Sequence, residues 1–333
     1  MKALLKSLSL LSCFFMTAAL VLAPVSGHAA KTRLAFSGGP EGGTFQYFSN
    51  GISTRLSKNL PNIEISNMAS AGSVENMRRI NSGEADFGIT YAGDLYLGRN
   101  GLLPKDTKKY ENALAMSYLY GAPGHLVVLA NSGITKVEDL AGKKVGVGGA
   151  GSGAAASAQR FFAAVGLWDK MQPQFIGYTE AVSAMGDNLL DAVWVFAGFP
   201  QSSVIQAAAS NKIRILDTYE AGVKSGFTKE YPFYTKVVIP ANTYTGVDYP
   251  VTTFQDSALW ITGKHVKTDI IYDSIKNVFS PDGLEYLLKV SKAAREMSVE
   301  NGIQGIATPL HPGAEKLWQE KGLSIADEQK APK

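Results

Sequence analysis

The chain has very little cysteine or histidine with which to build a reactive site. Cys13 is the only cysteine among the 333 residues, and there are four histidines. No disulfide can therefore form within the chain. His125, His265 and His311 stand in none of the spacings typical of metal sites, and no Gly-x-Ser-x-Gly elbow with evident partners is present. These absences argue against metal-dependent and nucleophilic catalysis, so we expect a protein that is not an enzyme and needs no cofactor.

Charge is also scarce. Only 18% of the residues are charged, and the formal net charge of +3 falls to +1 if Lys2 and Lys6 are removed with an N-terminal segment. A nearly neutral chain gives no support for nucleic-acid binding or for adsorption to a membrane surface. Hydrophobic residues make up 45% of the sequence, which is ample for a buried core in two lobes of ordinary size.

The first 29 residues have the three parts of a secretory signal peptide. Lys2 and Lys6 form a positive start, residues 8–22 are apolar, and residues 24–30 are mostly small. We expect cleavage after Ala29 and export of the rest of the chain. Two alternatives remain open. An uncleaved membrane anchor would need a longer apolar run, and lipidation at Cys13 would need the run to end there, whereas it continues.

Strand and helix patterns alternate along most of the chain, which predicts an α/β fold with right-handed crossovers and mostly parallel sheets. Helix 45–60, for example, has Phe48, Ile52 and Leu56 at four-residue spacing on one face. Predicted strands are 32–37, 62–67, 87–90, 126–130, 145–147, 175–177, 192–196, 213–216, 237–239 and 254–262; predicted helices are 45–60, 73–82, 154–165, 203–210, 267–279, 282–292 and 312–321.

No low-complexity linker separates the expected lobes, which indicates that the chain crosses between them more than once. We place the crossings near residues 119–124 and 240–246. Lobe I then comprises residues 30–120 and 246–305, lobe II comprises residues 121–245, and residues 306–333 form a C-terminal helix and a polar tail.

Two glycine-rich loops each follow a strand and open a helix. They are Gly38-Gly39-Pro40-Glu41-Gly42-Gly43-Thr44 and Gly146-Val147-Gly148-Gly149-Ala150-Gly151-Ser152-Gly153. Free backbone N–H groups at a helix N-terminus favour an anion, and glycine lets the backbone approach a ligand closely. Open α/β sheets bind ligands at the carboxyl ends of their strands. The loops therefore predict a small anion held in a cleft between two lobes.

A nucleotide site is the alternative interpretation of the second loop, because a dinucleotide fingerprint also joins a strand to a helix through glycines. However, no convincing acidic residue follows at the end of a second strand, and export argues against a cytosolic cofactor.

The candidate ligand-binding residues lie in these loops and at two further strand ends. Thr44 either caps its helix or contacts the ligand, and Asp94 either pairs with a ligand amine or caps the following helix. Phe45 and Trp194 fit a pocket wall and core packing about equally well. The full set is Gly43, Thr44, Phe45, Tyr91, Ala92, Asp94, Gly151, Ser152, Gly153, Trp194, Phe196, Ala197 and Gly198.

Neither glycine loop contains a lysine or an arginine. A carboxylate would then depend on backbone N–H groups, hydroxyls and helix dipoles. Arg99, His125 and Arg160 could supply charge, but we expect each of them at the surface.

Several short segments resemble the TAXI family, the immunogenic extracytoplasmic substrate-binding proteins associated with TRAP transporters. The segments run in order through nearly the whole chain, and their order and spacing are more specific than any one of them. They are Gly38-Gly39-Pro40-Glu41-Gly42-Gly43-Thr44-Phe45, Gly72-Ser73-Val74-Glu75-Asn76-Met77, Ser82-Gly83-Glu84-Ala85-Asp86, Asp139-Leu140-Ala141-Gly142-Lys143-Lys144-Val145, Gly151-Ser152-Gly153, Ile239-Pro240-Ala241-Asn242-Thr243-Tyr244 and His311-Pro312-Gly313-Ala314.

The resemblance implies a two-lobed periplasmic binding protein of type II, a monomer that delivers its solute to a fused-type TRAP permease driven by an ion gradient. Ligands of such proteins are typically glutamate, glutamine, 2-oxo acids or dicarboxylates. The sequence departs from the pattern at residues 90–94, where no Gln or Asn precedes Asp94, and at residues 194–200, which are bulky. An exported hydrolase and a ligand-sensing surface protein on the same scaffold are the alternative functions.

Overall fold

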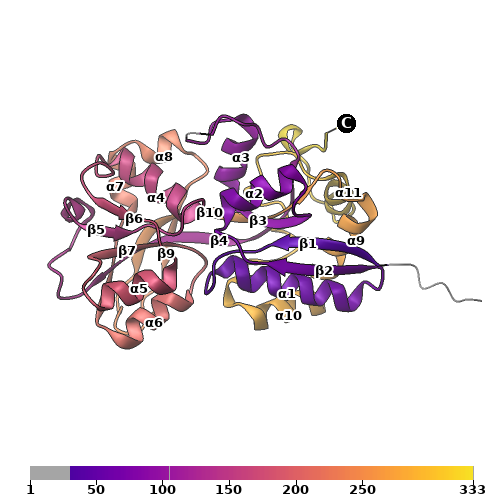
Figure 1. Cartoon of the computed structure of the whole chain (residues 1–333). Coiled ribbons are helices and arrows are strands. Elements are labelled where there is room, and N and C mark those ends of the chain that lie inside the picture. Colours follow the sequence, from indigo (N-terminus) through magenta and orange to yellow (C-terminus); the bar gives the residue numbers. More distant parts are fainter. Residues whose placement is uncertain (1–30, 105, 333) are drawn as a thin grey trace, which may run out of the picture. The chain divides into compact units, whose positions relative to one another are not determined.

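The computed structural model describes residues 31–332 apart from residue 105, and these form one compact unit (Figure 1). The predicted signal peptide, its cleavage site and Cys13 lie outside the described residues. Within the described part of the chain, no helix is both long and apolar enough to cross a membrane.

Three parallel strands form the sheet of the first lobe, which we call lobe I. The central strand β1 (Thr32–Ser37) pairs in parallel with β2 (Ile63–Met68) and with β3 (Phe87–Tyr91). Helices α1 (Thr44–Asn59), α2 (Ser73–Ser82) and α3 (Ala92–Asn100) follow these strands. The predicted apolar face of α1 is buried.

Lobe II repeats this plan. Its parallel strands are β5 (Lys144–Gly146), β6 (Gln172–Gln174) and β7 (Ala192–Phe196), with β5 between the other two. The remaining elements are η1 (Val137–Leu140), α4 (Gly153–Ala164), α5 (Tyr178–Gly186), α6 (Ser202–Ser210), β8 (Ile213–Leu216), α7 (Tyr219–Lys224) and α8 (Phe227–Glu230).

Two long strands belong to both lobes. Strand β4 (Ala113–Leu129) pairs with β10 (Val251–Gly263) over residues 113–123 and with β7 over residues 124–128. Strand β10 pairs with β3 over residues 258–262 and with β9 (Thr235–Ile239) over residues 251–255. Figure 1 shows β4 passing from one group of strands to the other. All these pairings of β4 and β10 are antiparallel, so the sheet as a whole is mixed.

The C-terminal elements return to lobe I. They are α9 (Thr268–Val278), α10 (Pro281–Val290), η2 (Lys292–Glu296), α11 (Pro312–Glu320) and η3 (Asp327–Gln329). Helices α9 and α10 pack against α1 (Figure 1). Each lobe has a tryptophan in its core: the ring of Trp260 stacks parallel to Phe36 in lobe I, and that of Trp194 stacks on Phe161 in lobe II.

The α/β class and most elements agree with the prediction. Several details differ. Helices α3, α7 and α8 are not among the predicted helices, and β4 begins at Ala113, well before the predicted start at residue 126. The strand expected at 175–177 lies at 172–174, and residues 178–186 form helix α5, which the sequence patterns did not reveal. The sheets are less parallel than expected, because β4 and β10 run antiparallel through both lobes. Strand β4 changes partner from β10 to β7 after residue 123, and β10 pairs with β9 over residues 251–255 and with β3 over residues 258–262. The division into lobes at residues 120 and 245 stays a prediction.

Candidate functional site

A small cavity lies where the N-termini of four helices meet. Helices α1 and α2 approach it from lobe I, and α4 and α5 approach it from lobe II. The cavity volume is about 20 Å³, which is room for roughly one water molecule. Its lining comprises Pro40, Gly43, Thr44, Phe45, Ala71, Gly72, Ser73, Tyr91, Tyr120, Gly149, Ser152, Gly153, Ala154, Gly177, Tyr178, Phe196 and Ala197. A larger ligand requires the two lobes to move apart.

Glycine makes this close approach possible. A Cβ atom at Gly153 would lie 2.3 Å from the Tyr91 ring and 2.8 Å from the Cβ of Ser73, both in lobe I. Gly72, which precedes α2, has a φ of +118°, a region that residues with a Cβ rarely adopt. The lobes can therefore meet in this way only with glycine at these loop ends.

Several backbone N–H groups at the cavity have no acceptor within the described chain. The first residues of an α-helix have no intrahelical acceptor for their N–H groups. Ser152 caps α4, and its Oγ accepts a hydrogen bond from the Ala155 N–H at 3.0 Å. The lining residues whose N–H groups have no partner in residues 31–332 are Thr44, Phe45, Ser73, Gly149, Gly153, Ala154, Gly177 and Tyr178.

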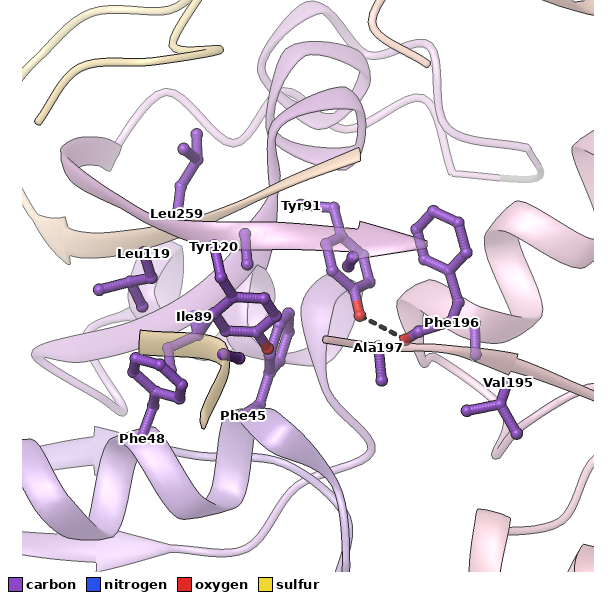
Figure 2. Close-up of a cluster of buried hydrophobic side chains, with 14 of the residues drawn as sticks. Phe45, Phe48, Ile89, Tyr91, Leu119, Tyr120, Val195, Phe196, Ala197 and Leu259 are labelled. Atoms are coloured by element: carbon purple, nitrogen blue, oxygen red, sulfur yellow. Dashed lines mark hydrogen bonds between the residues drawn. The ribbon is translucent and has the colours of Figure 1, made fainter. Parts of the chain in front are cut away.

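Aromatic side chains form the walls. The Phe45 and Tyr91 ring centres are 4.8 Å apart, and those of Tyr91 and Phe196 are 5.0 Å apart. Figure 2 shows Tyr120 beside Phe45, with Tyr91 and Phe196 facing each other from β3 and β7. The lining contains no lysine, arginine, histidine, aspartate or glutamate among the described residues.

The Phe196 carbonyl joins the two lobes at this point. It accepts a hydrogen bond from the Tyr91 hydroxyl of lobe I at 2.6 Å and a second from the Tyr178 hydroxyl of lobe II at 2.8 Å (Figure 2 shows the first). Burial raises the pKa of Tyr91 and that of Tyr178 well above the usual range. Both side chains therefore stay neutral and act as donors.

Tyr120 differs from these two tyrosines. Its side chain is fully buried and lines the cavity, yet within residues 31–332 its hydroxyl makes no hydrogen bond of normal geometry. Burial raises the pKa of Tyr120 well above its usual value, although the Thr44 side chain beside it acts in the opposite direction. A buried hydroxyl without a partner loses about 1–3 kcal/mol of solvation, so Tyr120 is available to a ligand.

Asp94 does not cap the helix that follows it. Its side chain is fully buried, and its carboxylate accepts hydrogen bonds from Ser73 Oγ at 2.6 Å and Arg160 Nη2 at 2.6 Å. Arg160, which we expected at the surface, is also buried and donates from Nε to the Tyr234 hydroxyl at 2.8 Å. The helix cap position is Tyr91. Asp94 and Arg160 thus form an ion pair between α3 of lobe I and α4 of lobe II.

Asp256 lies next to this ion pair on β10. Burial, followed by the nearby charge of Asp94, raises the pKa of Asp256 to about 8, although Arg160 acts in the opposite direction. The Asp256 carboxyl accepts hydrogen bonds from the N–H groups of Gly93 and Ser257. At neutral pH it therefore stays mostly protonated.

His125 and Arg99 also differ from their expected surface positions. His125 is fully buried in β4, where Nδ1 contacts the Pro123 carbonyl at 3.0 Å and Nε2 contacts the Tyr244 hydroxyl at 2.9 Å. Burial lowers the pKa of His125 to about 4. Arg99 is half-buried and donates to backbone carbonyls of Glu111 and Ala113. Neither residue lines the cavity.

The structure brings most of the predicted site residues to the cavity: Gly43, Thr44, Phe45, Tyr91, Ser152, Gly153, Phe196 and Ala197. The others lie elsewhere. Trp194 is buried in the lobe II core, where Nε1 donates to Ser157 Oγ. Gly151 accepts from the Glu75 N–H, Ala92 lies at the start of α3, and Gly198 packs against Ala293 and Tyr120.

Tyr120 and Tyr178 were not among the predicted site residues, and Ser73 appeared only within the segment 72–77 of the family resemblance. Tyr178 follows Gly177 at the start of α5, a glycine–helix junction like those of the two loops but with a single glycine. Tyr120 lies inside the predicted crossing at 119–124, which was a signal that this residue would face the cleft. Within the described residues, no group of three or more histidine, cysteine, aspartate or glutamate side chains could hold a metal ion.

Residues 36–322 match the model of the NMT1-like family. The chain belongs to the NMT1-like family. Among solved structures, it is similar to MatC from Rhodopseudomonas palustris with bound malate, at 15% sequence identity and a TM-score of 0.50; the match covers 87% of this chain and 96% of MatC. A structure described as a periplasmic transporter matches at 14% identity and a TM-score of 0.51, covering 90% of this chain and 94% of that one.

These matches confirm the predicted fold class, that of the periplasmic solute-binding proteins with two α/β lobes. The finer assignment to the TAXI family stays a prediction from the sequence.

Proposed function

We propose that this protein is an exported solute receptor that binds a small carboxylate in the cavity between its lobes and delivers it to a TRAP-type membrane permease. The observation that carries the proposal is the meeting of four helix N-termini at one small cavity. The unpartnered Tyr120 hydroxyl at the same cavity independently favours a ligand there.

The electrostatics favour an anion. Each helix N-terminus is equivalent to roughly half a positive charge, and unpartnered N–H groups there bind phosphates and carboxylates readily. The lining contains no cationic side chain among the described residues, so backbone dipoles would hold the carboxylate, as the glycine loops predicted.

The position between the lobes favours a receptor. A ligand in the cavity would contact α1 and α2 on one side and α4 and α5 on the other. Such a ligand stabilises the closed arrangement by as much as its affinity for the two arrangements differs. The closed form would then be the one that docks on the permease. MatC, which shares the fold, was solved with malate, a carboxylate.

The hydrolase alternative gains no support from the site. Ser152 Oγ is engaged in capping α4, and the described lining offers no histidine or carboxylate that could activate it.

A thermal-shift screen of small carboxylates and amino acids tests the proposal. A ligand at 100 times its Kd adds about 2.7 kcal/mol to the free energy of unfolding. At about 2.1 cal/mol/K per residue, this raises the Tm of a chain of about 300 residues by about 4 °C. Gly153→Ala, whose Cβ would meet Tyr91 across the cavity, should abolish the shift. A screen in which no small carboxylate raises the Tm would contradict the proposal.

A further inference from the structure

We infer that Asn76 is a positioning residue of the solute site: its side chain holds together the three segments of lobe I that line the cavity, with the lobes closed or apart. Asn76 itself does not line the cavity. This inference rests on the proposed function, because it concerns how one half of the same site keeps its shape.

The Asn76 side chain is completely buried and uses all of its hydrogen-bonding capacity. Its Oδ1 accepts from Ser37 Oγ at 2.7 Å and from Ser70 Oγ at 2.7 Å. Its Nδ2 donates to the carbonyls of Gly38 and Ile89, each at 2.7 Å. An amide side chain has two donor hydrogens and two acceptor lone pairs. Both backbone carbonyls can only accept, so the orientation of the amide group is fixed.

These four partners belong to three segments that are far apart in the sequence. They are the junction of β1 with the loop before α1, the loop between β2 and α2, and strand β3. Apart from Tyr120, which lies on β4, the lobe I residues of the cavity lining come from these segments and from the helix starts that follow them. One side chain therefore bonds to every segment on which this half of the lining is built, except β4.

The bonds of Asn76 act close to the start of α2. The Asn76 N–H donates to Gly72 O at 2.9 Å, and Ser70 Oγ accepts from the Gly72 N–H at 3.1 Å while it donates to Asn76. The two loops also contact each other, since the Ser70 N–H donates to Gly39 O at 3.3 Å. Fixing both loops fixes the direction in which the free N–H groups at the starts of α1 and α2 point.

A glycine on β3 gives the amide its place. A Cβ atom at Gly88 would lie 3.2 Å from the Asn76 Cβ and 2.9 Å from Ile80 Cδ1. A larger residue at position 88 would push α2 away from the strand. Gly88 therefore lets α2 pack closely enough for Asn76 to reach the Ile89 carbonyl.

All four bonds lie within lobe I, so none of them has to break when the lobes separate to admit a solute. Bonds between the lobes, such as the one from Tyr91 to the Phe196 carbonyl, do have to break. The lobe I half of the site is thus ordered before the solute arrives, and a preorganised site loses less affinity to the ordering of its own groups.

Asn76→Asp tests this role, because it keeps the shape and the Oδ1 acceptor but removes both N–H donors. The carbonyls of Gly38 and Ile89 then cannot both be satisfied. Isothermal titration calorimetry uses the carboxylate with the largest thermal shift, with L-malate as the first candidate. We expect a Kd about 10- to 100-fold weaker than that of the wild type, the range by which outer supports change affinity at metal sites. The Tm without ligand should fall by about 2–9 °C.

Two controls separate positioning from a general loss of stability. Trp318→Phe removes a buried hydrogen bond from Nε1 to the Met116 carbonyl at 2.8 Å, away from the cavity, and should lower the Tm by a similar amount. Asn112→Asp makes the same chemical change where Nδ2 donates to the Asn81 carbonyl at 2.9 Å, at the far end of α2. Both should leave the Kd within about twofold of the wild type.

Ser37→Ala is a milder variant that decides the matter if Asn76→Asp does not fold. It removes one donor to Asn76 Oδ1 and leaves the Ser70 hydroxyl in place. The Kd should then weaken about two- to tenfold.

Hydrogen exchange of the ligand-free protein, measured by mass spectrometry, gives a readout that needs no solute. In Asn76→Asp or Ser37→Ala, peptides covering residues 38–46 and 69–74 should exchange faster than in the wild type, while those of α9 and α11 stay unchanged, because the loosening is local. In Trp318→Phe the two loops should exchange as in the wild type.

The outcomes separate the inference from the proposed function. A wild-type Kd in both Asn76→Asp and Ser37→Ala, or an equal loss of affinity in Trp318→Phe, overturns the role of Asn76 and leaves a carboxylate receptor. Unchanged exchange in both loops overturns it as well. If the wild type binds neither L-malate nor any other carboxylate in the thermal-shift screen, the proposed function fails, and the exchange of the two loops alone decides whether Asn76 positions them.

Discussion

Replacing Arg160 by methionine should destabilise the protein strongly. The Arg160 guanidinium is bonded to the Asp94 carboxylate at 2.6 Å, and the two side chains are 3% and 0% exposed. The arginine also lies over the rings of Phe233 and Tyr234. Arg160→Met keeps much of this apolar contact but leaves the Asp94 charge buried without a counter-ion. Asp256 cannot replace the lost cation, because it is itself an acid.

The expected cost is about 3–5 kcal/mol, the usual range for removing one partner of a buried ion pair. At about 2.1 cal/mol/K per residue of unfolding entropy, the Tm of a chain of about 300 residues should fall by about 5–8 °C. Differential scanning calorimetry at neutral pH measures this directly. Arg214→Met is the control, because Arg214 is half-exposed and makes one long contact of 3.5 Å with the Ile134 carbonyl; it should change stability by at most about 0.5 kcal/mol.

A second variant tests the reason for the loss. Asp94→Asn combined with Arg160→Met removes both charges and keeps an acceptor for Ser73, so it should recover most of the lost stability. The reasoning is refuted if Arg160→Met lowers the Tm by less than 2 °C (about 1 kcal/mol by the same conversion), or if the double variant is less stable than the single one.

Two further predictions concern the same region. Tyr91→Phe and Tyr178→Phe should each cost about 0.5–1.5 kcal/mol of unfolding free energy, and together more than their sum, because the Phe196 carbonyl then loses both donors; additive losses in urea unfolding would contradict the shared-acceptor geometry. In the folded protein the pKa of Asp256 is about 8, above its ordinary value of 3.8. Between about pH 4 and pH 8 the folded form therefore keeps a proton on Asp256 that the unfolded chain has lost. The free energy of unfolding falls as the pH rises through this range. The Tm of Asp256→Asn relative to the wild type should therefore increase from pH 5 to pH 8, and a difference that stays constant over this range would contradict the raised pKa.

Short-range sequence patterns correctly predicted individual helices and the loops that begin them. The buried face of α1 and the glycine loops that open α1 and α4 were visible as spacing and composition. Helix α5 was missed, since its single glycine gives a weak start signal, and the length of β4 was underestimated because all but its last residue is buried and shows no alternation. A strand buried on both faces has no period-two pattern to read.

The site was predictable up to the point where distant residues must meet. Thr44, Ser152 and Gly153 could be predicted because a glycine loop followed by a helix start is visible in the sequence, and the free N–H groups of a helix start bind anions in any fold. The pairing of Asp94 with Arg160 could not be predicted, because 66 residues separate them in the chain and only the tertiary structure brings them together. Tyr120 was overlooked for a similar reason, since its significance comes from having no partner, which is a property of its surroundings.

The shared strands β4 and β10 also bear on how the protein can be divided. Most of lobe II lies between β4 and β10 in the sequence. However, residues 124–129 of β4 pair with strands of lobe II, and β9 pairs with β10. An isolated fragment of residues 121–245 would contain only residues 121–129 of β4, and its strand β9 would have lost its partner β10. A protease cut in either strand would damage both sheets at once, so neither lobe is a module that can be transplanted alone, and the lobes should unfold together as a single cooperative unit.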